Sequence, residues 1–372
     1  MTIAVDTRSL GAGRNEAGRS FERSYLLSFA QDLPQHHFLF IADKLFAPGI
    51  SFPKNVTPLT VGPEIKNSLL MQYWFNYKLP GLLRKHKADV FVATEGICSL
   101  RTKTPQCLLI PDTSFLQSPL HFIKPNTRYY KKNTKAFLAK ARSVAVSSEF
   151  SRSLLIDQYK EEAAKAEVIT SYTDEMFTPI DPDEKENIKK IYAGGREYFL
   201  SPAINNPRSN LLNLLKAFSF FKKRQKSNML LLITGDPGEA FMNELRTFRF
   251  RNEVKLIQNP CREEIAKITA AAYVLVYPVL YTDDAEVPLQ AMQCRVPVIT
   301  SNSGALPETC GDAALYVDPA NFEDIAQKMM LVFKDEDQAK EMVRAGVERA
   351  GHFKKANSYE QLWSLIKKAA NG

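Results

Sequence analysis

Short apolar runs alternate with helix-like stretches along almost the whole chain, and this alternation constrains the fold more than any other feature. In the first half we expect strands at IAVDT, HFLFIA, DVFVAT, QCLLIP, SVAVSS and AEVITS, separated by helices such as RSFERSYLLSFAQDL and residues 148–160. Apolar runs of this length between helical segments are typical of buried strands in a parallel sheet. The first half therefore predicts a doubly wound α/β domain.

The second half repeats the pattern. Its expected strands are YFLSPA, MLLLITG, EVKLIQN, YVLVYPVL, VPVITS and ALYVD, and its expected helices are 208–224, 239–247, 262–271 and one beginning at Pro288. The polar segment 178–196, with prolines early and glycines late, is predicted to be the linker. We therefore expect a first domain at 1–177, a second at 197–352, and a ligand in a cleft between them at the carboxyl ends of the strands.

Length and composition suit two globular cores. The 372 residues are 45% hydrophobic and 24% charged, which are ordinary values for folded domains. The start MTIAVDTRSL lacks the order of a signal peptide, and no apolar run is long enough to cross a membrane. The five cysteines lack CxxC spacing, so we expect neither disulfides nor a zinc site. Free thiols suit a reducing compartment, and we therefore expect a cytoplasmic location.

The net charge of +8 indicates an anionic partner. The basic segment 124–142 interleaves Lys and Arg with Tyr129, Tyr130 and Phe137. One interpretation is a helix at an anionic membrane surface, which would make the protein peripheral on the inner face of the membrane. The other is a solvated helix whose apolar stripe packs on the core. Nucleic acid is not an expected partner, because no binding motif accompanies the charge.

The stretch VLYTDDAEVPLQAM, residues 279–292, places Asp283, Asp284 and Glu286 between a strand and a helix that is expected to begin at Pro288. Carboxylates suit the positive end of a helix by about 0.3–1 kcal/mol each, but they repel a diphosphate bound there. We interpret them as exposed acids that cap the helix. The alternative, chelation of Mg²⁺, is less favoured, and no metal is expected.

Longer motifs resemble glycosyltransferase family 4. NPRSNLLNLLKAF (206–218) is similar to the family's P-R-K-N-L-x-x-L-L-x-A-F stretch, and residues 279–319 are similar to its run from L-Y-E-G-F-G to D-A-A-x-x-V-D-P. IAVDTRSL, LIPDTSFL and VSSEFSRSLL in the first half resemble further family motifs in the same order. The resemblance thus extends over essentially the whole chain.

This resemblance implies the GT-B fold, in which two Rossmann-like domains face each other. It also implies a final helix, here 353–372, that braces the first domain, with Trp363 and Leu365 as its anchors. The family transfers a sugar from a nucleotide-activated donor with retention of configuration, so a UDP- or GDP-sugar is the expected substrate and no separate cofactor is needed. The expected acceptor is a glycan or a lipid-linked glycan of a surface polysaccharide.

The donor-side motifs supply candidate residues and several departures. By resemblance, Arg208 faces the leaving diphosphate, which a guanidinium suits. Ser209 stands where the family has lysine, and Thr282 and Gln290 stand where it has a pair of glutamates. Gln290 can still hydrogen-bond ribose hydroxyls. Asp283 stands where the family has a glycine.

The first half departs from the family as well. The His-Asp pair of the family reads Pro111-Asp112, so the histidine is lost, and Asp112 is expected to cap or orient its loop or to take part in catalysis. The glycine-rich loop GAGRNEAGRS (11–20) keeps Gly18 and Arg19 as candidate donor contacts. His121 is interpreted as an ordinary loop residue.

Three functions therefore stay open. The first is a working hexosyltransferase in surface polysaccharide synthesis. The second is a catalytically inactive relative that binds a glycan or a partner protein. The third, and least favoured, is an epimerase on the same scaffold, with Asp112, Glu95 and the acids at 283–286 as its only candidate acid–base groups. The motifs do not select the nucleotide, the sugar or the acceptor.

Overall fold

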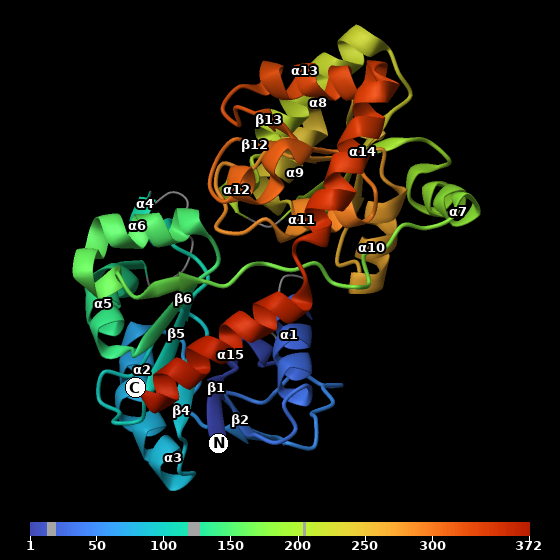
Figure 1. Cartoon of the computed structure of the whole chain (residues 1–372). Helices are drawn as coiled ribbons and strands as arrows, with labels where there is room; N and C mark the ends of the chain where they lie inside the picture. The colour runs from blue at the N-terminus through green and yellow to red at the C-terminus, as the bar shows by residue number, and fades with distance from the viewer. Residues whose placement is uncertain (13–19, 118–126, 204–205) are drawn as a thin grey trace. The chain divides into compact units, whose positions relative to one another are not determined.

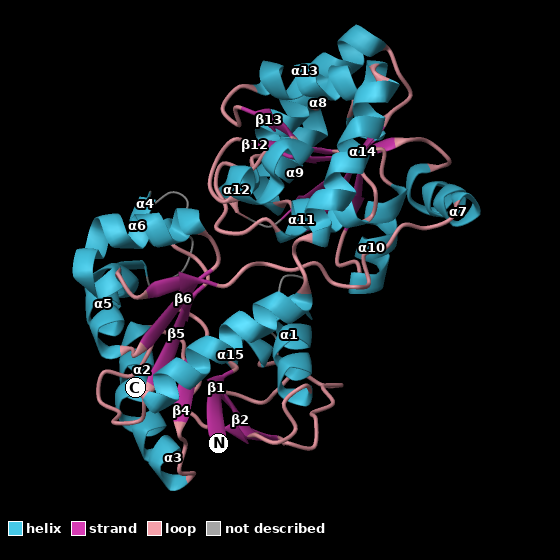
Figure 2. Cartoon of the chain, in the orientation of Figure 1, coloured by secondary structure: helices cyan, strands magenta, loops and turns pink. Residues whose placement is uncertain are grey.

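The chain forms two compact units in the computed structural model, which describes residues 1–12, 20–117, 127–203 and 206–372 (Figure 1). Unit 1 comprises Met1–Thr170 and Ala356–Gly372, and unit 2 comprises Ser171–Lys355. Each unit has its own parallel sheet flanked by helices (Figure 2). No helix in the described part of the chain is long and apolar enough to cross a membrane.

The described residues of unit 1 form a seven-stranded sheet in the order β3-β2-β1-β4-β5-β6-β7, in which all strand pairs are parallel. The strands are β1 Thr2–Asp6, β2 His37–Ala42, β3 Val56–Thr60, β4 Val90–Ala93, β5 Gln106–Ile110, β6 Ser143–Val146 and β7 Ala166–Val168. Strand β3 was not expected from the sequence. It lies at the sheet edge, contains Pro58 and is buried only at Val56. An edge strand that is mostly solvated lacks the apolar run that identified the other strands.

Helices cover both faces of the unit 1 sheet. The helices are α1 Ser20–Gln31, α2 Ser68–Tyr73, α3 Leu79–Lys85, α4 Ser114–Gln117, α5 Thr127–Lys140, α6 Glu149–Tyr159 and α15 Lys355–Asn371, with a π-helical turn η2, Trp74–Lys78, between α2 and α3. On one face, Leu39 and Ile41 of β2 pack with Trp74 of η2 and Phe137 of α5. On the other face, Phe38 contacts Phe29 of α1.

The terminal helix α15 packs against the α1 side of unit 1. The Tyr359 hydroxyl donates to the Tyr25 carbonyl at 3.1 Å, and the Ser143 hydroxyl donates to the Leu365 carbonyl at 2.9 Å. Leu365 is buried, and the ring of Trp363 lies 4.7 Å from that of His36. Leu365 therefore anchors α15 in the core of unit 1, and Trp363 packs on His36 at its surface.

The described residues of unit 2 form a six-stranded parallel sheet in the order β10-β9-β8-β11-β12-β13. The strands are β8 Tyr198–Ala203, β9 Leu230–Gly235, β10 Val254–Ile257, β11 Val274–Tyr277, β12 Val298–Ser301 and β13 Leu315–Val317. The helices are α7 Pro182–Ala193, α8 Leu211–Gln225, α9 Gly238–Thr247, α10 Arg262–Ala271, α11 Glu286–Gln293, α12 Leu306–Cys310, α13 Phe322–Lys334 and α14 Glu336–Gly351.

The segment 178–196, expected to be a linker, contains helix α7 and belongs to unit 2. Asp181 caps the helix by accepting from the Glu184 N–H, Pro182 occupies its first turn, and Gly194 ends it at φ 59°. Proline at the start and glycine at the end are helix boundaries as well as loop signals. Ile188 and Ala193 of α7 are buried in the unit 2 core, so this segment packs as part of the domain.

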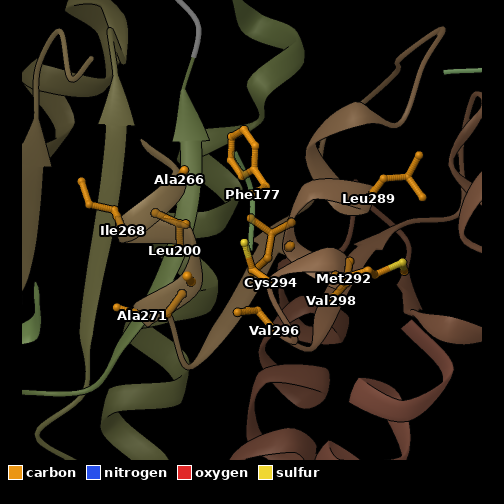
Figure 3. Close-up of a cluster of buried hydrophobic side chains, with 14 of the residues drawn as sticks. Phe177, Leu200, Ala266, Ile268, Ala271, Leu289, Met292, Cys294, Val296 and Val298 are labelled. Atoms are coloured by element: carbon orange, nitrogen blue, oxygen red, sulfur yellow. The ribbon is translucent and has the colours of Figure 1, made fainter. Parts of the chain in front are cut away.

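Helix α11 is held by a cluster of buried apolar side chains. Leu289 and Met292 of α11 pack with Val298 of β12, Leu200 of β8 and Ala266 of α10 (Figure 3). This apolar face fixes α11 against the sheet. The N-terminus of α11 is therefore set in place at the carboxyl end of β11.

Candidate functional site

The loop that carries Arg208 is fastened to the loop that leads into α11. Asn206 caps the short 3₁₀ turn Pro207–Ser209 by accepting from the Arg208 N–H at 2.9 Å. The Leu280 N–H donates to the Arg208 carbonyl at 2.9 Å. The Asn210 amide donates to the Pro278 carbonyl at 2.7 Å. These bonds bring the two donor-side motifs, 206–218 and 279–292, together at the carboxyl ends of the strands.

Arg208 and the 280–286 loop, which are distant in the sequence, are thus neighbours at the carboxyl ends of β8 and β11.

The charged groups of these two loops act on the same tyrosine. Burial raises the pKa of Tyr277, the last residue of β11. The Asp284 and Glu286 carboxylates raise this pKa further, whereas the Arg208 guanidinium lowers it. Opposing contributions from Arg208 and the two acids mean that all three charges lie close to this phenol. The edge of the sheet therefore combines one guanidinium with a pair of carboxylates.

The loop 278–285 is closely packed against its neighbours. The Ala305 N–H donates to the Thr282 carbonyl at 3.0 Å, and Gly304 adopts φ +63°. A Cβ at Gly304 would lie 2.2 Å from the Thr282 carbonyl oxygen, so only glycine fits there. The Thr282 hydroxyl donates to the Asp284 carbonyl at 2.9 Å. Thr282, one of the expected donor contacts, therefore directs its hydroxyl into its own loop.

The three acids before α11 differ in their surroundings, and the expectation that all three are exposed is wrong. Asp283 is buried and accepts a hydrogen bond from the Tyr281 hydroxyl at 2.8 Å. Asp284 is exposed, and its carboxylate accepts from the Glu286 N–H at 3.3 Å. Glu286 is itself the first residue of α11, two positions before the expected helix start at Pro288. Only Asp284 therefore fits the description of an exposed capping acid.

Glu286 belongs to a chain of polar contacts. The Gln290 amide donates to Glu286 Oε1 at 2.5 Å, and Arg262 of α10 lies 3.6 Å from the same oxygen. Arg262 also pairs with Asp174 at 2.8 Å. Burial and the Asp284 charge raise the pKa of Glu286 to about 8, although Arg262 opposes the shift. Gln290, expected to bind ribose, is therefore held in place by a carboxyl group on the same helix.

Ser209 and Asp112 have local structural partners. Ser209 is buried, and its N–H donates to the Asn206 carbonyl at 3.0 Å. In unit 1, Asp112 accepts from the N–H of Ser114 at 2.9 Å and from its hydroxyl at 2.5 Å. Asp112 thus accepts from the first residue of α4 and orients the backbone where this helix begins. Gly18, Arg19 and His121 lie outside the described residues.

Asp112 also lines a small pocket at the carboxyl ends of β4 and β5. Its lining residues are Glu95, Gly96, Ile110, Pro111, Asp112, Phe115, Tyr130 and Thr134. The Tyr130 hydroxyl donates to the Glu95 carbonyl at 3.1 Å. Pro111, where the resembled family has histidine, is exposed and offers neither a donor nor a titratable group.

A buried ion pair beside this pocket was not predicted from the sequence. Arg8 donates to both carboxylate oxygens of Asp6 at 2.9 Å and to Glu95 Oε2 at 3.2 Å. Its guanidinium lies 4.6 Å from the centroid of the Phe75 ring. Burial alone would lower the pKa of Arg8, but the Asp6 and Glu95 carboxylates raise it. The available signal was Asp6 at the end of a buried strand, with Arg8 two positions later.

No cluster of three or more His, Cys, Asp or Glu in the described ranges could hold a metal ion. The polar groups around α11 are the guanidinium groups of Arg208 and Arg262, amides, hydroxyls and carboxylates. Such groups can bind an anionic diphosphate and the hydroxyls of a sugar.

Comparison with known proteins relates the chain to glycosyl transferases. Residues 183–349, most of unit 2, match the family model described as glycosyl transferases group 1. The chain is 25% identical to O-antigen chain mannosyltransferase B of Escherichia coli over 260 residues, covering 69% of this chain and 68% of that protein. It is 23% identical over 241 residues to serotype-specific mannosyltransferase WbdA of Escherichia coli, covering 63% of this chain and 30% of that longer protein.

The fold is shared with solved structures over the full length. The structure of Anabaena Alr3699/HepE in complex with UDP-glucose matches with a TM-score of 0.75 at 16% identity, covering 99% of each chain. Together with the two parallel sheets, this match establishes the GT-B fold. Residues 183–349 of unit 2 are similar to the group 1 glycosyl transferases.

Proposed function

We propose that this chain transfers a hexosyl residue from a nucleotide-sugar donor to a glycan or lipid-linked acceptor during synthesis of a surface polysaccharide. The observation that carries the proposal is the bond between the Leu280 N–H and the Arg208 carbonyl, which holds Arg208 beside the N-terminus of α11 within the matched domain. A helix N-terminus and a guanidinium at the carboxyl end of a parallel sheet suit a bound diphosphate. The mannosyltransferase relatives support sugar transfer in polysaccharide synthesis.

In the proposed mechanism, Arg208 binds the diphosphate and stabilises the charge that develops as the bond to the sugar breaks. Gln290 accepts from a ribose hydroxyl through its carbonyl oxygen, because its amide nitrogen is engaged by Glu286. Asp283 is buried and accepts a hydrogen bond from the Tyr281 hydroxyl, so we assign it a structural role in the loop rather than a contact with the diphosphate. Gly18 and Arg19 remain proposed donor contacts.

The donor is proposed to be a UDP- or GDP-sugar. Alr3699/HepE has been solved with UDP-glucose, and both curated relatives are mannosyltransferases. Mannose is therefore the first sugar to test, with glucose as the comparison. A donor of this kind is consistent with work on the cytoplasmic side of a membrane, where we propose that the protein acts.

A second function is favoured by a specific observation. The Thr282 hydroxyl bonds its own loop, the Gln290 amide bonds Glu286, and Pro111 replaces a histidine. Positions that bind the sugar in the resembled family are thus engaged internally or lack the required group. This pattern supports an inactive homologue that binds a glycan or supports a partner enzyme.

Calorimetry with the full chain and a panel of UDP- and GDP-sugars distinguishes the two functions. The transferase predicts saturable binding of one nucleotide-sugar and slow release of its nucleoside diphosphate, followed by faster release when the acceptor is added. Absence of binding across the panel would contradict the transferase and leave the inactive homologue. Binding with turnover would exclude the inactive homologue.

A further inference from the structure

One side of the α2–η2 helix exposes three large side chains in a row. Leu69, Tyr73 and Tyr77 expose 76%, 43% and 54% of their surface. Residues four apart lie on the same side of a helix, so the three form a continuous stripe, which we call the tyrosine stripe. Trp74 and Phe75, on the other side, are fully buried in the core of unit 1. The helix therefore buries one apolar face in the core and exposes a second apolar face to solvent.

Basic side chains lie over the two aromatic rings of the stripe. The Tyr73 and Tyr77 rings stack with centroids 5.8 Å apart and an angle of 22° between their planes. The Arg101 guanidinium lies 4.2 Å from the centroid of Tyr77, and Lys78 Nζ lies 5.9 Å from that of Tyr73. Contacts of this kind place positive charge beside each ring. The stripe is thus apolar in the middle and basic at its sides.

The surrounding sequence has one sign of charge. Between Ile65 and Asp89 there is no Asp or Glu, although Glu64, just before this interval, lies 3.8 Å from Lys66. The basic residues in this interval are Lys66, Lys78, Arg84, Lys85 and Lys87. An exposed aliphatic side chain and two tyrosines with Lys78 and Arg101 beside them match the layered chemistry of a lipid headgroup region over acyl chains.

We propose that the tyrosine stripe docks this protein on an anionic lipid surface. Leu69 enters the acyl boundary, the two tyrosines lie at headgroup level, and Lys78 and Arg101 contact anionic lipid headgroups. A free glycan would stack on the tyrosines, but it would use neither the exposed Leu69 nor the basic side chains beside the rings. The observations therefore favour the membrane.

The basic helix α5 offers charge without an apolar contact. Lys131, Lys132 and Lys135 are exposed, whereas Tyr130 and Phe137 are buried in the unit 1 core. The aromatic residues that suggested a membrane helix at 124–142 thus pack inward where they are described. Residues 124–126 lie outside the described residues. Helix α5 adds electrostatic attraction, and the tyrosine stripe supplies the anchor.

Vesicle flotation with the full chain tests the proposal. We expect binding to vesicles of phosphatidylcholine mixed with phosphatidylglycerol, and little binding to phosphatidylcholine alone. The triple variant Leu69→Ser, Tyr73→Ser, Tyr77→Ser should lower the partition coefficient at least about tenfold. Ile191→Ser is the matched control, because Ile191 is 62% exposed on α7 of unit 2, and it should bind as the unchanged protein does.

Thermal unfolding of each variant shows whether it is folded, and exposed positions should leave the midpoint unchanged. Failure of the unchanged protein to bind anionic vesicles would overturn the proposal. So would unchanged binding by a folded triple variant. A folded Lys131→Gln, Lys132→Gln, Lys135→Gln variant should lose less binding than the triple stripe variant, and the reverse order would assign the anchor to α5 instead.

Discussion

The side-chain amide of Gln290 donates to Glu286 Oε1 at 2.5 Å, one helical turn earlier on α11. A glutamate at position 290, as the resembled family has, would place two carboxyl groups against each other on neighbouring turns. Like charges at this spacing destabilise a helix, and Glu286 already has a raised pKa. The pair explains why an amide suits position 290 once an acid occupies position 286.

The first prediction concerns the pH dependence of stability. The pKa of Glu286 is about 8 in the folded protein, above the value of about 4.3 in an unfolded chain. Its proton is therefore bound more tightly in the folded state, so its contribution is fully present below about pH 4.3 and is lost as the pH rises toward 8. Glu286→Gln should remove this loss and be more stable than the unchanged protein at pH 8.5, by about 1–3 kcal/mol.

Urea unfolding at pH 5, 7 and 8.5 measures this difference. Glu341→Gln is the control, because Glu341 on α14 is exposed and its pKa is lowered by Arg344. If the stability of Glu286→Gln and of the unchanged protein varies with pH in the same way, the raised pKa of Glu286 is contradicted.

The second prediction exchanges the two side chains. Gln290→Glu alone should destabilise unit 2 by about 1 kcal/mol or more above pH 8, because two ionised carboxyl groups would share one site. Adding Glu286→Gln should restore most of the loss, since one amide and one carboxyl group are again paired. Thermal unfolding of the single and double variants gives the coupling energy. Additive effects would show that the two side chains do not interact.

The third prediction tests Arg208 in donor binding. Arg208→Ala should weaken binding of a nucleoside diphosphate about 10- to 100-fold, because a charge-assisted hydrogen bond contributes about 1.5–3 kcal/mol. Calorimetry with UDP and GDP measures the change. Arg344→Ala, at an exposed position on α14, should bind as the unchanged protein does. Equal affinity of the two variants would remove Arg208 from the proposed site.

The sequence predicted most of the sheets because both are buried on two faces, which leaves continuous apolar runs such as those of β5 and β9. It missed β3, an edge strand interrupted by Pro58. It also assigned a linker to α7, because Pro182 and Gly194 mark helix ends as well as loops. Local signals of this kind become unambiguous only when the packing of the segment is known.

The candidate site was predicted less completely. Motif order placed Arg208 and the 279–292 stretch in the same domain, and the structure joins them through Leu280. The hydrogen bond between the Tyr281 hydroxyl and the buried Asp283 could not be predicted from the sequence, because both residues lie in a loop, where side-chain directions follow no fixed period. The contact of Arg262 with Glu286 joins two helices, and no sequence spacing encodes it.

The fourth prediction concerns the close approach at Gly304. Gly304→Ala should destabilise unit 2 by about 1–3 kcal/mol, because its φ is +63° and the added Cβ would meet the Thr282 carbonyl oxygen. Gly351→Ala is the matched control, since nothing lies within 4 Å of the Cβ it would add. Thermal unfolding compares the two variants. Equal midpoints would mean that the loop at Thr282 yields without cost.

The fifth prediction concerns the buried pair of Asp6 and Arg8. Arg8→Met would leave Asp6, which is fully buried, without the cation that contacts both its carboxylate oxygens. Removing one member of a buried ion pair costs about 3–5 kcal/mol. Burial already raises the pKa of Asp6, so the loss should be larger at pH 8 than at pH 5, because lower pH favours the neutral, protonated carboxyl group. Urea unfolding at both pH values measures it.

The double variant Asp6→Asn, Arg8→Met separates lost charge pairing from lost packing. It should recover part of the stability of Arg8→Met, because no ionised group is then buried at position 6, although Arg8 also packs on Phe75 and that contact is changed. Arg344→Met, in an exposed pair with Glu341, should cost less than about 1 kcal/mol. If Arg8→Met costs no more than Arg344→Met, the buried pair does not stabilise unit 1.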